Sequence, residues 1–138
     1  MNKKYSLYIG RWQPLHLAHD FIIRKALDNG ESVLIGVRDT LISDSDPYSA
    51  EQRVEMISAH YKDEDVKVMV MPDISSVNIG RKVGYAINRY DAPQDIEGIS
   101  ATQIRNLMAE GDDSWKDFVP PAIADYLSKK ENGVSNNE

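Results

Sequence analysis

The alternation of hydrophobic and polar stretches along the chain predicts strands and helices in turn. Three nearly continuous apolar runs are typical of strands buried in a parallel sheet: residues 5–9, 32–37 and 66–71. Two stretches between them repeat apolar residues at three- and four-residue spacing, which predicts helices: residues 17–28 and 50–61. The order strand, helix, strand, helix, strand predicts the first half of a Rossmann-like sheet.

Residues with strong local preferences mark the ends of these elements. Gly10 interrupts the first apolar run, and Pro14 prevents a helix from beginning before it. Asn29-Gly30 is a typical helix stop. Ser49 is a good N-cap for the second helix, and Gln52 three residues later completes a capping box.

The second half of the chain gives a weaker pattern. Residues 73–98 could be an irregular loop running into a short strand or helix, with a turn near 92–95 and a short edge strand at 96–99. A helix over about 101–110 follows Ser100 as its N-cap. We expect an α/β fold of Rossmann-like three-layer α/β/α type, with a small parallel sheet of four to five strands that is reduced in its second half.

The C-terminal part predicts one more helix and a tail. Pro120-Pro121 suits a helix start, and the apolar spacing carries this helix to about Lys130. The polar residues 131–138 are expected to be disordered. The chain of 138 residues is long enough for one core, so we expect a single domain over residues 1–130.

Composition excludes several classes of function. The net charge is −6, which argues against broad binding to nucleic acid or to anionic membranes, because both need a basic face. The absence of cysteine excludes disulfides and thiolate metal sites. With only three histidines, a metal cluster bound by histidines is not favoured either. Neither a signal peptide nor a membrane-spanning run is evident, so a cytoplasmic protein is expected.

Polar residues collect between the first strand and the first helix. Arg11, Gln13, His16 and His19 all fall in this short stretch, and the two histidines share one face of the helix start. The N-terminus of a helix offers unpaired N–H groups and partial positive charge, which suit a phosphate. The stretch therefore predicts a phosphate site.

A similar arrangement precedes the helix over 101–110. Ser100 and Thr102 place hydroxyl groups in its first turn, and Arg105 adds a cation one turn further on. This is a second helix N-terminus suited to phosphate. Each of the two motifs alone is weak evidence for phosphate binding. Together and in this order they are far more specific than either alone.

These two motifs resemble those of the cytidylyltransferase-like nucleotidyltransferases. Residues 10–19, GRWQPLHLAH, are similar to the G-R-F-Q-P-x-H-x-G-H form found in nicotinamide mononucleotide adenylyltransferases, with Trp12 for Phe and Ala18 for Gly. Residues 99–105, ISATQIR, are similar to I-S-x-T-x-x-R. Residues 47–53 also resemble the N-P-F-x-x-x-x-R region of adenylyltransferases. The resemblance covers about 5–72 and 99–110.

The resemblance implies transfer of a nucleoside monophosphate, AMP being favoured, from a nucleoside triphosphate to a phosphate-bearing acceptor, with release of pyrophosphate. ATP (or CTP) and Mg²⁺ bridging its phosphates would be needed, and a homo-oligomer would be in keeping with relatives. No protein metal ligands are expected. The implied catalytic residues are His16, His19 and Arg105. The implied nucleotide-binding residues are Gly10, Arg11, Trp12, Gln13, Ser100 and Thr102, and those near the acceptor or its phosphate are Arg38, Asp39, Arg53 and Arg81.

Other interpretations stay open from the sequence. Glu97-Gly98-Ile99-Ser100 resembles the E-G-I-S of glycerol-3-phosphate cytidylyltransferase, so CTP with a polyol phosphate is an alternative. A non-catalytic nucleotide-binding sensor is a second one, motivated by Ala18 and by the short segment between Pro72 and Ile99, which has no counterpart to the acceptor-binding segment. A plain structural Rossmann-like domain that binds no nucleotide is a third. Several residues also have ordinary structural interpretations: Trp12 as packing, the arginines as surface groups, and Asp44 and Asp46 as solvated loop residues.

Overall fold

A computed structural model describes residues 3–81, 84, 86–88 and 98–137, with side chains as far as Lys129. Three strands form its parallel sheet in the order β1-β2-β3: β1 (Tyr5–Gly10), β2 (Ser32–Asp39) and β3 (Val66–Pro72). Tyr5 pairs with Ser32, and Val33 pairs with Val66, at the start of the two ladders. The three carboxyl ends therefore lie at one edge of the sheet.

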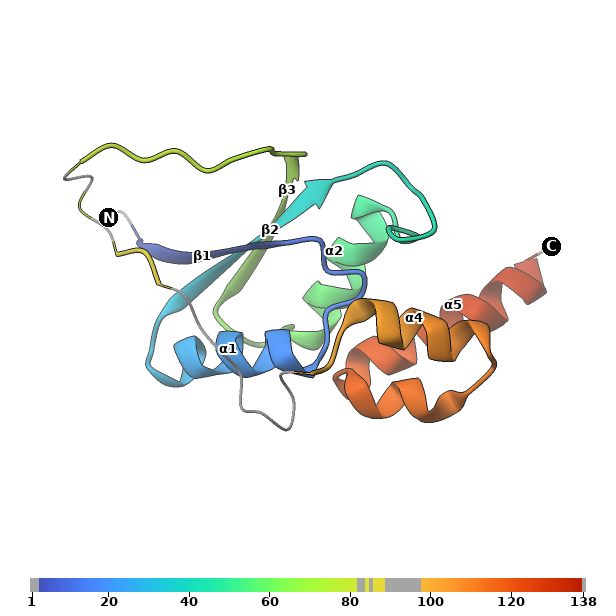
Figure 1. The fold of residues 1–138 in the computed structure, drawn as a ribbon. Helices are drawn as coiled ribbons and strands as arrows, with labels where there is room; N and C mark the ends of the chain where they lie inside the picture. Colours follow the sequence, from blue (N-terminus) through green and yellow to red (C-terminus); the bar gives the residue numbers. More distant parts are fainter. Residues whose placement is uncertain (1–2, 82–83, 85, 89–97, 138) are drawn as a thin grey trace.

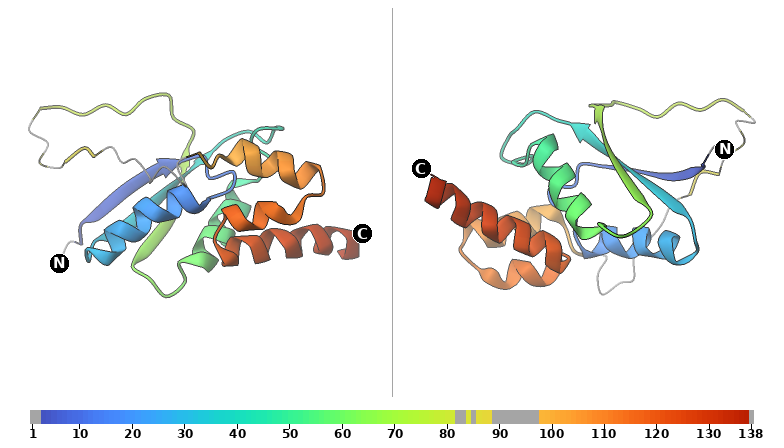
Figure 2. Two further views of the ribbon diagram at one scale, coloured as in Figure 1. Left: turned by 60° about the horizontal axis from the view of Figure 1, so that its bottom comes forward. Right: turned by 180° about the vertical axis from the view of Figure 1, so that it is seen from behind.

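Two helices connect the strands and cover one face of the sheet (Figures 1 and 2). They are α1 (Leu17–Asp28) and α2 (Ala50–His60). Successive right-handed crossovers that advance in one direction place both helices on the same face, as observed. The helix ends follow the predicted signals: Gly30 has φ +80° after α1, and Ser49 and Gln52 form the capping box of α2.

The remaining helices lie beside the carboxyl edge of the sheet (Figure 1). They are α4 (Ala101–Ala109), the 3₁₀ helix η1 (Asp113–Phe118) and α5 (Pro121–Asn137), and α5 packs against α2. Helix α5 continues to Asn137 where an end near Lys130 and a tail were expected. Its last turns contain no proline, and a single glycine, Gly133, costs a helix only about 1 kcal/mol.

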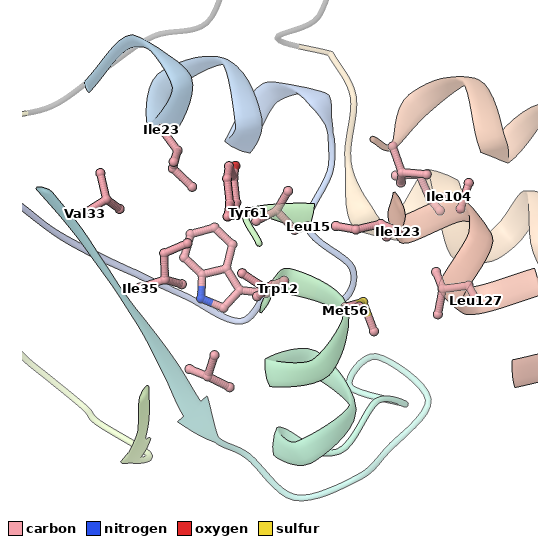
Figure 3. Close-up of a cluster of buried hydrophobic side chains, with 14 of the residues drawn as sticks. Trp12, Leu15, Ile23, Val33, Ile35, Met56, Tyr61, Ile104, Ile123 and Leu127 are labelled. Carbon is pink, nitrogen blue, oxygen red and sulfur yellow. The ribbon is translucent and has the colours of Figure 1, made fainter. Parts of the chain in front are cut away.

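One hydrophobic core joins the sheet, α1 and α2 to the C-terminal helices (Figure 3). Val33 and Ile35 of β2 face Ile23 of α1, while Ile104 and Ile123 join α4 to α5. All five side chains are fully buried. Burial of such a side chain stabilises a fold by about 1.5–3 kcal/mol, so the C-terminal helices are firmly attached beside the sheet edge.

The α/β, Rossmann-like class is confirmed, with two differences in detail. The described residues form three strands where four to five were expected, and α1 and α2 cover one face where a three-layer fold has helices on both. The expected edge strand at 96–99 falls partly outside the described residues, and Gly98 and Ile99 are not in a strand. The described part of 73–98 contains neither helix nor strand, and the expected turn at 92–95 lies outside it.

Membrane-spanning helices are not found: within the described residues, no helix combines the necessary length with sufficient apolar character.

Candidate active site

The loop that follows β1 is shaped around the side chain of Trp12. This residue has φ +54°, a conformation that few non-glycine residues adopt, and its indole Nε1 donates a hydrogen bond of 3.0 Å to the carbonyl of Gly36. The ring lies 4% exposed between α1 and β2 (Figure 3). A Cβ on Gly10 would lie 2.9 Å from the ring. The lack of a side chain at Gly10 therefore makes room for Trp12, and the expected contact of Gly10 with the nucleotide stays a prediction.

His16 and His19 stack on each other at the N-terminus of α1. Their ring centroids are 3.7 Å apart with an angle of 18° between planes, and the rings of Trp12 and His19 form a T-shaped pair with centroids 4.7 Å apart. The backbone N–H of His16 donates to Nδ1 of His19 at 3.2 Å. Because Nδ1 of His19 accepts, its neutral ring carries the proton on Nε2. His19 thus presents an N–H donor.

Both histidines are neutral at physiological pH. Burial lowers the pKa of His16 to about 4, and burial together with the charge of His16 lowers the pKa of His19 to about 3. Nδ1 of His16 is buried and has no hydrogen-bond partner among the described residues. A buried polar atom without a partner is costly, and a bound ligand would relieve that cost.

Arg105 connects the two motifs. Its Nη1 donates to the carbonyl of Gln13 at 2.8 Å, and its Nη2 lies 3.3 Å from the hydroxyl of Thr102. Ser100 caps α4, because its hydroxyl oxygen accepts from the N–H of Gln103 at 3.1 Å. The hydroxyl proton of Ser100 stays available to a ligand. The N-terminus of α1 and the N-terminus of α4 therefore lie next to each other at one site.

Residues from both motifs line a single cleft of about 310 Å³. Its walls come from the loop after β1, from the start of α1 and from the start of α4: Arg11, Trp12, Gln13, His16, His19, Ile99, Ser100, Ala101 and Thr102. The volume is at the lower end for a small-molecule site. Neutral N–H donors, hydroxyl groups, two helix N-termini and adjacent arginines suit phosphate oxygens.

Hydrogen bonds of Gln13 and Arg53 hold the loops that form this cleft in place. The Gln13 amide donates to the carbonyl of Tyr48 at 3.1 Å and accepts from the N–H of Tyr48 at 3.0 Å. Arg53 is fully buried and donates to the carbonyls of Arg11, at 2.8 Å, and Ser49, at 3.2 Å. These bonds join the loop after β1 to the loop before α2.

The residues expected near the acceptor are not gathered in the cleft. Arg53 is buried under the loop and donates to backbone carbonyls, and its expected contact with an acceptor or phosphate stays a prediction. Arg38 is paired with Asp73 at 2.8 Å, so its guanidinium is engaged beyond the end of β2. Asp39 and Arg81 are exposed, and neither lines the cleft.

Asp46 is a residue of the site that the sequence did not reveal. It was expected in a solvated loop, but its side chain is only 14% exposed, and Oδ2 lies 3.6 Å from Nη1 of Arg11. Its other oxygen, Oδ1, is buried without a hydrogen-bond partner among the described residues. The one available signal was its position directly before Pro47, in the region that resembles N-P-F-x-x-x-x-R.

A comparison of the sequence with protein-family models identifies a family whose motifs are those that line the cleft. The family model described as cytidylyltransferase-like matches residues 7–130, so the chain belongs to this family. The match includes both motifs of the cleft. The expected class, a nucleotidyltransferase, is therefore confirmed.

Individual relatives favour the adenylyl form of that class. The chain is 28% identical to a nicotinamide-nucleotide adenylyltransferase of Methanospirillum hungatei, over 94% of this chain and 90% of the relative. It is 29% identical to one of Picrophilus torridus, over 94% and 93%. A solved structure of a bifunctional NMN adenylyltransferase/ADP ribose pyrophosphatase from Francisella tularensis is 30% identical over 51% of this chain and 22% of its own, with a TM-score of 0.42.

Proposed function

We propose that the protein transfers AMP from ATP to a mononucleotide acceptor, with nicotinamide mononucleotide as the first candidate, and releases pyrophosphate. The observation that carries the proposal is the hydrogen bond between Arg105 and the carbonyl of Gln13, because it joins the two phosphate-binding motifs at one cleft. The similarity to nicotinamide-nucleotide adenylyltransferases over 94% of the chain supports the choice of nucleotide and acceptor.

In this reaction an oxygen of the acceptor phosphate attacks the α-phosphorus of ATP in line. A new bond forms between that oxygen and the α-phosphorus, and the bond from the α-phosphorus to the bridging oxygen of the β-phosphate breaks. Pyrophosphate leaves with this bridging oxygen. The acceptor phosphate is already a nucleophile, so the protein needs to supply position and charge stabilisation instead of a base.

The residues of the cleft suit these tasks. The Nε2–H of His19 is assigned to an oxygen of the α-phosphate, where charge develops in the transition state, and His16 is assigned to the adjacent phosphate oxygen. Ser100, Thr102 and Arg105 are assigned to the pyrophosphate. Arg11 is partly exposed at the mouth of the cleft and adds a further cation for the polyphosphate.

Mg²⁺ is part of the proposal as the ion that ATP carries. The cleft is lined with donors that suit phosphate oxygens, and Mg²⁺ in nucleotide sites commonly binds through substrate phosphates with one or two carboxylates. When bound, the ion would neutralise charge on the phosphates.

The proposal is tested by measuring pyrophosphate release together with the mass of the product. Protein is incubated with Mg²⁺ and either ATP plus nicotinamide mononucleotide or CTP plus glycerol 3-phosphate. We expect pyrophosphate and a dinucleotide from the first pair. Product from the CTP pair alone would replace the adenylyltransferase by a cytidylyltransferase, and nucleotide binding without any product would favour a sensor.

A further inference from the structure

Asp46 occupies an unusual electrostatic position beside the nucleotide cleft. Oδ2 of its carboxylate lies 3.6 Å from Nη1 of Arg11, a long ion pair whose arginine is 46% exposed. The other oxygen, Oδ1, is buried and has no hydrogen-bond partner among the described residues. A carboxylate usually accepts several hydrogen bonds when it is withdrawn from water. The carboxylate of Asp46 therefore makes fewer hydrogen bonds than a buried carboxylate normally does.

Asp46 is also held in place by its own backbone. Its N–H donates to the carbonyl and the hydroxyl of Ser43, at 3.1 and 3.2 Å, and its carbonyl accepts from the N–H of Ser43 at 3.1 Å. Next to it, Gln13 and Tyr48 fasten this loop to the loop after β1. These bonds fix the backbone of Asp46 beside the arginines.

The cations around Asp46 outnumber it. Burial lowers the pKa of Arg53, and the charge of Asp46 opposes that effect. Burial and the neighbouring charge of Arg11 lower the pKa of Arg105, and Asp46 again opposes them. Asp46 therefore interacts with three arginines, Arg11, Arg53 and Arg105, while Asp39 and Asp73 also act on Arg53.

We propose that Asp46 is an internal counter-ion for Arg11 that competes with the polyphosphate of the incoming nucleotide, so that binding exchanges a carboxylate contact for a phosphate contact at this arginine. The inference rests on the proposed function, since the competing anion is the nucleotide. In this role Asp46 lowers the affinity of the cleft for the polyphosphate, because its carboxylate competes with the phosphates for Arg11. A residue that only supports the loop would have the opposite effect when it is replaced.

The test is a calorimetric titration with inorganic tripolyphosphate, which carries the anionic groups without base or acceptor. The variant Asp46→Asn removes the charge and keeps the shape, and Asp44→Asn removes one charge from an exposed position of the same loop. We expect Asp46→Asn to bind tripolyphosphate about three- to tenfold more tightly than wild type, because the partly exposed pair is weakened by solvent. Asp44→Asn should change the affinity by less than about twofold.

A second pair of variants tests whether the effect passes through Arg11. In an Arg11→Gln background, the gain from Asp46→Asn should disappear, since the competition has no arginine to act on. Thermal unfolding verifies that each variant is folded, and Asp46→Ser replaces Asp46→Asn if the latter is not.

Three results would contradict the proposal in distinguishable ways. Unchanged or weaker binding by folded Asp46→Asn, while wild type binds, would overturn the role of Asp46 alone. A gain that persists without Arg11 would overturn the exchange at this arginine. Absence of tripolyphosphate and ATP binding in every protein would overturn both this inference and the proposed function.

Discussion

The guanidinium of Arg105 donates a 2.8 Å hydrogen bond to the backbone carbonyl of Gln13, across 92 residues of sequence. This contact brings the start of α4 against the loop that follows β1. Because a guanidinium offers five donors in a fixed plane, Arg105 can hold the loop and still present N–H groups to a ligand. The two helix starts that line the cleft are therefore parts of one site.

Removal of this guanidinium should impair catalysis far more than folding. We expect Arg105→Gln to lower kcat/KM for ATP by about 100-fold, since one charged donor aimed at the pyrophosphate is lost. Lys62→Gln removes one positive charge from an exposed position outside the cleft and serves as the control. Equal steady-state rates for the two variants would refute the assignment of Arg105.

His19 is expected to act through its Nε2–H. The variant His19→Asn removes this donor, and we expect kcat to fall about 100-fold or more with a similar unfolding temperature. His60→Asn is the control, because His60 lies outside the cleft and contacts Asp20 at 2.8 Å. Initial-rate kinetics with both substrates varied would measure the effect. Near wild-type turnover by His19→Asn would remove His19 from the mechanism.

The neutral histidine pair predicts how stability depends on pH. The folded-state pKa values, about 4 for His16 and about 3 for His19, lie below the ordinary value of 6.5. Below pH 6.5 the unfolded chain therefore binds protons that the folded protein does not, and acid destabilises the fold. Between pH 7 and pH 5 each histidine should reduce the free energy of unfolding by about 1–2 kcal/mol.

Urea unfolding at several pH values between 5 and 7 measures this dependence. The double variant His16→Asn/His19→Asn should lose most of the slope. A variant slope parallel to that of wild type would show that the two histidines do not resist protonation in the folded state. Carboxylates with lowered pKa, such as Asp20, contribute mainly below this pH window.

Gly10 tests the packing that supports the site. A methyl group at Gly10 would lie 2.9 Å from the ring of Trp12, so Gly10→Ala should displace the indole and lower the free energy of unfolding by about 1–3 kcal/mol. Gly98→Ala is a suitable control, since no atom of the described residues lies within 4 Å of the added Cβ. The blue shift of Trp12 fluorescence expected for a buried indole would weaken in the first variant. Equal stabilities would contradict the packing argument.

The elements of the first half were predictable because their signals are local. Strand and helix periods, the stop at Gly30 and the capping box of Ser49 and Gln52 are all read within a few neighbouring residues. The fold class follows from their order. In contrast, the 3₁₀ helix η1 and the extension of α5 beyond Lys130 have no strong local marker.

The candidate site was predictable in its motifs and not in its supporting contacts. His16, His19 and Arg105 stand in recognisable patterns, and the structure brings them together. The family resemblance implied that Arg53 contacts an acceptor or phosphate, and nothing in the local sequence indicated its burial. Its partners are carbonyls of Arg11 and Ser49, and only the folded backbone places the first of them within reach.

The central claim is transfer of AMP, and radioactive labels on ATP test it most directly. With Mg²⁺ and nicotinamide mononucleotide, label from [α-³²P]ATP should appear in the dinucleotide product, and label from [γ-³²P]ATP should appear in pyrophosphate. Label from the γ position in the acceptor or in inorganic phosphate, with no α label in a dinucleotide, would contradict the account, because it would show attack at the γ-phosphorus instead of the α-phosphorus.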